Sequence, residues 1–180
     1  MTYYGAKELA ESFRTVRRNT IQTAQDIPED KYAFKATPET RSVEKLLTHI
    51  ALGYRFQYQI NAVEPLSTMG NFDFMGLFQK LGAEEAKPRD KAAVIEFLKS
   101  EGEIWAKFVD GVSEEFLSQI VTFPQGAMPP SKSRLELLTT VKEHEMHHRG
   151  QLMLIQRMMG IVPHLTRQNQ ERMAQRQQQR

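Results

Sequence analysis

Residues 132–159 read KSRLELLTTVKEHEMHHRGQLMLIQRMM, a long apolar stretch that Gly160 and Pro163 bring to an end. Apolar side chains recur in it at steps of three and four residues, which is the period of an α-helix. The side that they form consists of Leu135, Leu138, Val141, Leu152 and Ile155, with His148 among them. The stretch therefore predicts one long amphipathic helix, whose apolar side other elements must cover.

Three earlier segments show the same helical period. They predict helices over about residues 6–24, 42–60 and 90–111, and Ser42 and Asp90 are the expected N-caps of the second and third. No useful run of alternating apolar and polar residues is found, and no internal repeat is evident. Four amphipathic helices with two long connections predict an all-α fold, a four-helix bundle.

The connections between these helices are unusually long. Residues 64–82 hold Phe72, Phe74 and Phe78 and predict a connection with at most one short helix. Residues 113–116 begin another short turn, and the proline-containing residues 121–130 predict irregular or briefly extended structure. The segment after the first helix, residues 26–38, and the segment 121–130 are expected to be the loops that cross between helices.

Length and composition indicate one soluble domain. A chain of 180 residues is long enough for one hydrophobic core and short for two. We expect the domain over residues 1–165 and a polar tail over 166–180, rich in Gln and Arg, that is either helical or disordered.

Charge and hydropathy argue against several kinds of binding partner and cellular location. No stretch approaches the run of about 18 apolar residues that a membrane-spanning helix needs, and the first residues lack a secretory signal, so we expect a cytoplasmic protein with no membrane contact. The formal net charge of +2 is too small to predict binding of nucleic acid. Cysteine is absent, so a metal site must be built from His and carboxylate side chains, and any thiol must come from a ligand.

The long helix carries a metal-site motif, His144-Glu145-Met146-His147-His148. His144 and His148 lie one turn apart on one face of an α-helix, so their two imidazoles can bind one divalent ion. His49, at the edge of the inward face of another predicted helix, is the best third ligand. His147 is rotated by about 100° from His148 and points partly away, and His164 is expected at the surface or at a helix start.

Two neighbours of the histidines have several interpretations. Glu145 is a general base, a residue that orients a ligand imidazole, or a solvated helix residue. Gln151 either reaches into the site, toward a metal-bound water or a substrate, or faces solvent. The histidines themselves could also be incidental, because such pairs occur on solvated helices and a single histidine such as His49 often belongs to a core.

The same letters satisfy the His-Glu-x-x-His signature of zinc proteases, but the rest of the chain disfavours that class. A metzincin continuation needs a glycine and a histidine at the positions that Gln151 and Leu154 occupy. A thermolysin-like site needs a downstream glutamate, and the only acidic residue after Glu145 is Glu171, in the polar tail.

Two segments, Arg41–Ile50 and His144–Leu152, resemble the DinB/YfiT-like family of metal-binding four-helix-bundle proteins, and the resemblance covers roughly residues 5–165. It implies a bundle of up-down-down-up order with a long crossover. It also implies that His49, His144 and His148 bind zinc or nickel, with water completing the shell, and that the protein forms a homodimer.

Related proteins include transferases and isomerases that use a low-molecular-weight thiol such as mycothiol or bacillithiol. The resemblance therefore implies a metal-dependent enzyme, a thiol-dependent transferase or a hydrolase, acting on a small molecule at an open three-histidine site. The alternatives are a non-catalytic metal-binding or stress-related protein and a helical interaction module. No catalytic residue is assigned beyond a metal-bound water or thiol.

Overall fold

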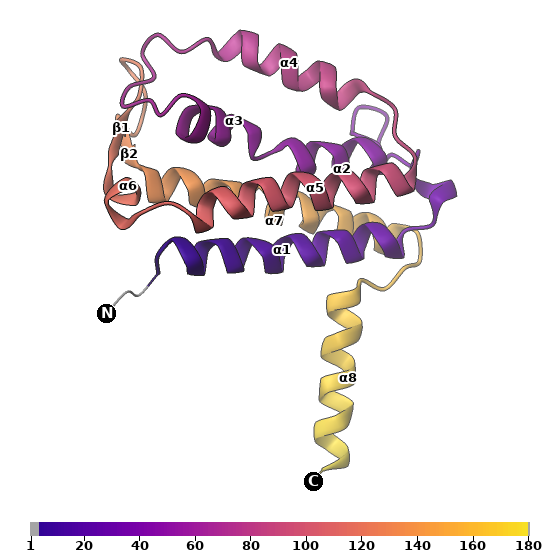
Figure 1. Ribbon diagram of the computed structural model, residues 1–180. Coiled ribbons are helices and arrows are strands. Elements are labelled where there is room, and N and C mark those ends of the chain that lie inside the picture. The colour runs from indigo at the N-terminus through magenta and orange to yellow at the C-terminus, as the bar shows by residue number, and fades with distance from the viewer. Residues whose placement is uncertain (1–3, 180) are drawn as a thin grey trace.

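Four helical segments pack side by side in the computed structural model, which describes residues 4–179 (Figure 1). Residues 1–3 of the predicted domain and Arg180 of the predicted tail lie outside the described residues. Each of the four helices falls where the sequence predicts one. They are α1 (Ala6–Asp26), α2 (Val43–Leu52), α5 (Lys91–Asp110) and α7 (Arg134–Met158).

The four helices run up, down, down and up in chain order, as Figure 1 shows. Both α1 and α2 pack against α5 and against α7, so α1 and α2 occupy diagonally opposite corners of the bundle. Because α2 and α5 run the same way, the chain must return along the bundle between them, and α4 (Phe74–Ala86) makes this return (Figure 1). The predicted all-α bundle with a long crossover is confirmed.

The predicted helix starts are confirmed by their hydrogen bonds. The Ser42 hydroxyl accepts a bond from the Lys45 amide at 3.2 Å, and the Asp90 carboxylate accepts one from the Ala93 amide at 2.7 Å. The helix predicted over residues 42–60 is interrupted at Gly53 and Tyr54. It continues as α3 (Arg55–Tyr58) and then as a π-helical turn, η2 (Gln59–Val63).

The connections contain more structure than the sequence predicts. The helix α4 has 13 residues, longer than the short helix expected in this connection. After α5 the chain forms α6 (Glu114–Ser118) and a hairpin in which β1 (Ile120–Thr122) pairs antiparallel with β2 (Ser131–Ser133). These three-residue strands are a small exception to the all-α prediction. A 3-10 turn, η1 (Glu29–Lys31), lies between α1 and α2.

Two apolar clusters fill the bundle and are separated by a polar layer. One cluster includes Leu9, Phe13, Trp105 and Leu138. The other includes Ala24, Leu47, Leu98 and Leu152. Arg17, Glu101 and Glu145 lie between the two clusters along their own helices, and each is at least 94% buried. A smaller third cluster, around Ile60 and Val121, lies at the hairpin.

The buried ion pair between Arg17 and Glu145 dominates the polar layer. Nε of Arg17 donates to both oxygens of Glu145 at 3.0 Å, and Nη2 donates to Oε2 at 2.9 Å. The remaining amino group donates to the carbonyl of Leu98 at 2.6 Å. A Cβ atom at Gly102 would lie only 2.9 Å from Cγ of Arg17, so the absence of a side chain on α5 makes room for the guanidinium. The pair thus ties α1 to both α5 and α7.

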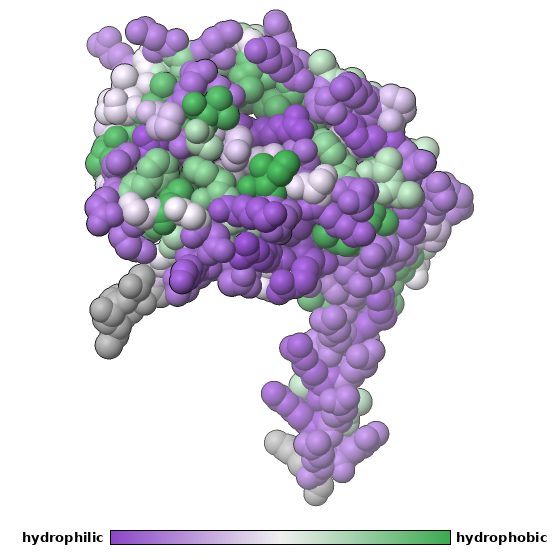
Figure 2. Space-filling view, in the orientation of Figure 1, coloured by the Kyte–Doolittle hydropathy of each residue, from purple (hydrophilic) through white to green (hydrophobic). Residues whose placement is uncertain are grey.

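The predicted polar tail is helical. It forms α8 (His164–Gln178), which projects from the bundle and shows a hydrophilic surface (Figures 1 and 2). His164 begins this helix, as predicted, but its side chain is only 3% exposed and approaches Asn19, so a surface position is wrong for it. Among the described residues, no helix is both long and apolar enough to cross a membrane.

Replacing Arg17 with methionine should lower the free energy of unfolding by about 3–5 kcal/mol, because Glu145 would stay buried without its counter-charge. The double variant Arg17→Met, Glu145→Leu should recover part of this loss. Urea unfolding followed by circular dichroism measures both values. Arg18→Met, at an exposed position of the same helix, is the matched control and should change the free energy by less than about 0.5 kcal/mol. Equal losses in the Arg17 and Arg18 variants would contradict the assigned role of the pair.

Candidate metal centre

The structure brings His49, His144 and His148 together at the seam between α2 and α7. Nε2 of His144 lies 3.1 Å from Nε2 of His49 and 3.2 Å from Nε2 of His148. All three side chains are half-buried, and one nitrogen of each lies within 4.8 Å of the others. This three-histidine group could hold a metal ion.

The outer nitrogens of two of these imidazoles have hydrogen-bond partners. Nδ1 of His49 lies 2.8 Å from Oε2 of Glu85, and Nδ1 of His148 lies 2.8 Å from Oε1 of Gln151. Both partner atoms are oxygens that accept, so Nδ1 carries the proton in each histidine. Burial alone would raise the pKa of Glu85, but hydrogen bonds from His49 and Arg41 lower it to about 2, so this carboxylate is ionised at neutral pH.

Because the protons of His49 and His148 lie on Nδ1, the lone pairs on their Nε2 atoms are directed at His144. A neutral His144 can donate a single proton from Nε2, so the three nitrogens cannot satisfy one another by hydrogen bonding. A tetrahedral zinc ion, with N–metal bonds of about 2.0–2.1 Å, holds its ligand nitrogens about 3.3 Å apart. The two observed separations of 3.1 and 3.2 Å therefore fit a divalent ion.

The surroundings also favour the neutral form of His144 and of His148. Burial, together with the neighbouring imidazoles of His148 and His49, lowers the pKa of His144 to about 4. Burial likewise lowers the pKa of His148, against a raising effect of its bond to Gln151. A neutral imidazole is the form that binds a metal, so protons compete weakly with a metal for these two imidazoles at neutral pH.

The structure separates Glu145 from the histidine group. Its carboxylate is 1% exposed and receives its hydrogen bonds from Arg17, so the interpretation as a solvated residue is wrong. The same bonds direct it into the bundle, away from a role in orienting His144 or His148. Gln151 does lie at the site, where its amide joins His148 to His147. His147 is exposed and stays outside the three-histidine group, as the helix rotation predicts.

Sequence reasoning did not identify Glu85 and Gly53 as parts of the site. Glu85 comes from α4, a segment predicted mainly as a connection, and it reaches His49 across 36 positions of sequence. Gly53 ends α2 against His144: a Cβ atom there would lie 2.6 Å from Nδ1 of His144. A glycine inside the helix predicted over residues 42–60 is the one local signal that could have indicated such a close approach.

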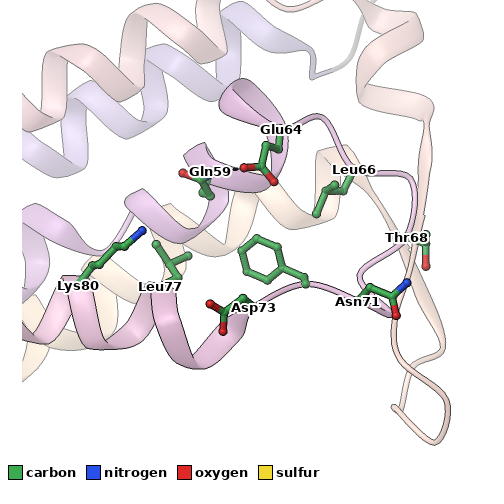
Figure 3. Close-up of a pocket in the computed structure, with 9 residues that line it drawn as sticks. Gln59, Glu64, Leu66, Thr68, Asn71, Asp73, Leu77 and Lys80 are labelled. Carbon is green, nitrogen blue, oxygen red and sulfur yellow. Dashed lines mark hydrogen bonds between the residues drawn. The ribbon is translucent and has the colours of Figure 1, made fainter.

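Two pockets open at the histidines, and Arg41 lines both. One, of about 390 Å³, is reached by His148 and Gln151. The other, of about 300 Å³, is reached by His49 and His144 and is walled by Phe56 and Phe78. A third pocket, of about 490 Å³, lies between η2 and the start of α4 and shares no lining residue with them (Figure 3). The three-histidine group is thus accessible from two sides.

The variant Gly53→Ala should weaken metal binding by about tenfold or more, because the new methyl group must displace the imidazole of His144. The backbone at Gly53 is right-handed helical and tolerates alanine, so the fold should be retained. Competition with a chromophoric chelator measures the affinity. Gly82→Ala is the matched control, because Gly82 and Gly53 both line the pocket of about 300 Å³, but a Cβ atom at Gly82 meets nothing within 4 Å. Unchanged affinity in Gly53→Ala would argue against this geometry.

The metal-free protein should lose stability as the pH falls from about 6.5 toward about 4. The pKa of His144 is lower in the folded state than its ordinary value, so the unfolded chain binds more protons in this window, and acid favours unfolding. Urea unfolding at pH 7 and pH 5 after chelator treatment measures the change. His144→Asn should show a smaller loss, while His147→Asn, at an exposed position, should behave as the native protein does. Equal pH dependence in all three proteins would contradict the assigned shift.

Comparisons with known proteins concern the fold and the family of the chain. A DinB-like protein, YjoA, of Bacillus subtilis matches with a TM-score of 0.64 and 21% identity, covering 86% of this chain and 93% of that one. A conserved protein of Enterococcus faecalis matches with a TM-score of 0.62 and 16% identity, covering 83% and 93%. At these identities the likeness concerns the fold, and no curated protein matches the chain. The family model described as DinB matches residues 1–180, and the chain therefore belongs to the DinB family.

Proposed function

We propose that the protein is a metal-dependent enzyme that transfers a group to or from a low-molecular-weight thiol. The observation that carries this proposal is the convergence of three Nε2 atoms, at 3.1 and 3.2 Å, beside two pockets. Three protein ligands leave a divalent ion with an open position, which is typical of catalytic sites and not of structural ones. Zinc and nickel are the proposed metals, because both accept imidazole ligands.

The chain's own residues prepare the site for such an ion. Glu85 holds the proton of His49 on Nδ1, and Gln151 does the same for His148, so each ring presents a lone pair to the centre. When bound, the ion would supply a positive charge that lowers the pKa of a thiol and so provides a thiolate at neutral pH. The sequence contains no cysteine, so this sulfur must belong to a ligand.

The two pockets favour a reaction between two molecules. Each reaches different histidines, and Arg41 stands where their linings meet. One pocket can hold the thiol while the other holds the molecule with which it reacts, whereas a hydrolase needs room for one substrate and a water. We therefore favour a transferase over a hydrolase. A homodimer and a cytoplasmic location, where low-molecular-weight thiols stay reduced, are further parts of the proposal.

The first test of the proposal is the metal content of protein purified without a histidine tag. The native protein and the control His147→Ala should contain about one equivalent of zinc or nickel. His49→Ala should lose most of it, because one of the three ligands is gone. Metal retained by His49→Ala would contradict the three-histidine site.

Activity is the second test. The metal-loaded protein is incubated with mycothiol, bacillithiol or glutathione and a panel of electrophiles, and conjugates are detected by mass spectrometry. We expect metal-dependent conjugation with at least one thiol, abolished in His49→Ala. Hydrolysis of an ester panel without conjugation would favour the hydrolase, and metal binding without either activity would favour a non-catalytic role.

A further inference from the structure

Arg41 has capacity for hydrogen bonding that the protein does not use. Its Nε donates to Oε1 of Glu85 at 2.6 Å, and this is the one hydrogen bond that its guanidinium makes within residues 4–179. The side chain is 44% exposed and lines both pockets at the histidines. Its two terminal amino groups are therefore available to a ligand that enters either pocket.

The charge balance at this point favours an anion. The single carboxylate of Glu85 is shared, with Oε1 bound to Arg41 and Oε2 bound to His49. A divalent ion on the histidines would add two positive charges to the same neighbourhood. Guanidinium groups bind planar carboxylates through two parallel hydrogen bonds, and such bonds are stronger than neutral ones. Arg41 can therefore hold the carboxylate of a ligand in a pocket that the histidines also line.

One side of the pocket beside His148 is apolar and suits an apolar group of a ligand. Leu154 and Met158 are large side chains with exposed fractions of 61% and 53%, and both line this pocket. Ala36, Leu46 and Ile155 complete its apolar wall. The exposed carboxylate of Glu39 also lines the pocket and disfavours a second anionic group at that point. Apolar side chains grouped at a pocket beside a polar centre are typical of a binding site for a small amphipathic molecule.

We propose that this site takes a small thiol that carries a carboxylate and an apolar arm. The carboxylate binds Arg41, and the arm lies against Leu154 and Met158. The inference rests on the proposed thiol chemistry and adds a substrate class to it. It also assigns Arg41 as the residue that selects for the anion.

Cobalt(II)-substituted protein allows a direct test, because a thiolate that binds the metal produces a charge-transfer absorption band. Three thiols are titrated: 2-mercapto-3-phenylpropanoate, 2-phenylethanethiol, which lacks its carboxylate, and mercaptoacetate, which lacks its apolar arm. The first should bind the native protein about tenfold or more tightly than either of the others, because one charge-assisted contact or one buried apolar group is worth roughly that factor.

Variants separate the two contacts. Arg41→Gln should weaken binding of both carboxylate thiols by about tenfold and leave 2-phenylethanethiol within about twofold, while Arg41→Lys should retain part of the preference. Leu154→Asn should weaken the two phenyl thiols and spare mercaptoacetate. Glu39→Gln is the matched control in the same pocket and should not weaken any of them. The cobalt content of each variant is measured first, so that loss of the metal is not mistaken for loss of the thiol.

Two results would overturn the inference in distinguishable ways. The assignment of Arg41 would be overturned if 2-mercapto-3-phenylpropanoate and 2-phenylethanethiol bound with equal affinity, both to the native protein and to Arg41→Gln. The absorption band would still support binding of a thiol to the metal in that case. Bound cobalt without a band from any of the three thiols would overturn the proposed thiol function, and this substrate class with it.

Discussion

The buried ion pair between Arg17 and Glu145 determines how the rest of the molecule is arranged. Two charged groups removed from water are tolerated only when they satisfy each other and their remaining donors, and here the guanidinium also binds the carbonyl of Leu98. Because Glu145 must point at α1, the rotation of α7 about its axis is fixed. Successive residues of a helix differ by about 100° in direction, so His144 and His148 turn together toward α2, where His49 lies.

This arrangement changes the meaning of the motif His-Glu-Met-His-His. In a zinc protease the glutamate acts on a metal-bound water, and the two histidines and the glutamate share one site. Here the glutamate and the two histidines face different neighbours. Glu145 belongs to the buried core, and His144 and His148 belong to the candidate metal centre. The sequence of the motif is the same in both kinds of site. The helices that pack against it determine which kind of site it forms. Arg17 on α1 and His49 on α2 are the partners that these helices supply.

Much of the fold and the three histidines could be predicted from local patterns in the sequence. Helical periodicity marks the four helices, and capping residues such as Ser42 and Asp90 mark where two of them begin. The i, i+4 spacing brings His144 and His148 onto one face, and His49 follows from its place beside an apolar stripe. The partners of these residues could not be predicted in the same way. Arg17 meets Glu145 across 128 positions, and Glu85 meets His49 across 36, so both contacts exist only once the helices have packed.

The helix α4 shows why the missed contacts matter for the site. It buries no side chain fully, so apolar packing alone does not fix its position. Its C-terminal end is held instead by Lys45, whose ammonium group donates to the carbonyls of Glu85, Ala86 and Lys87, each at 3.0 Å. The contact between Glu85 and His49 therefore supports the imidazole and also helps to hold α4 against the bundle.

A carboxylate bound to Nδ1 of a histidine raises the electron density that Nε2 offers to a metal, and a metal on Nε2 strengthens the Nδ1 hydrogen bond in return. A metal ion bound to the three histidines would therefore help to hold α4 in place. In return, the position of α4, which forms one wall of a pocket, would favour binding of the metal.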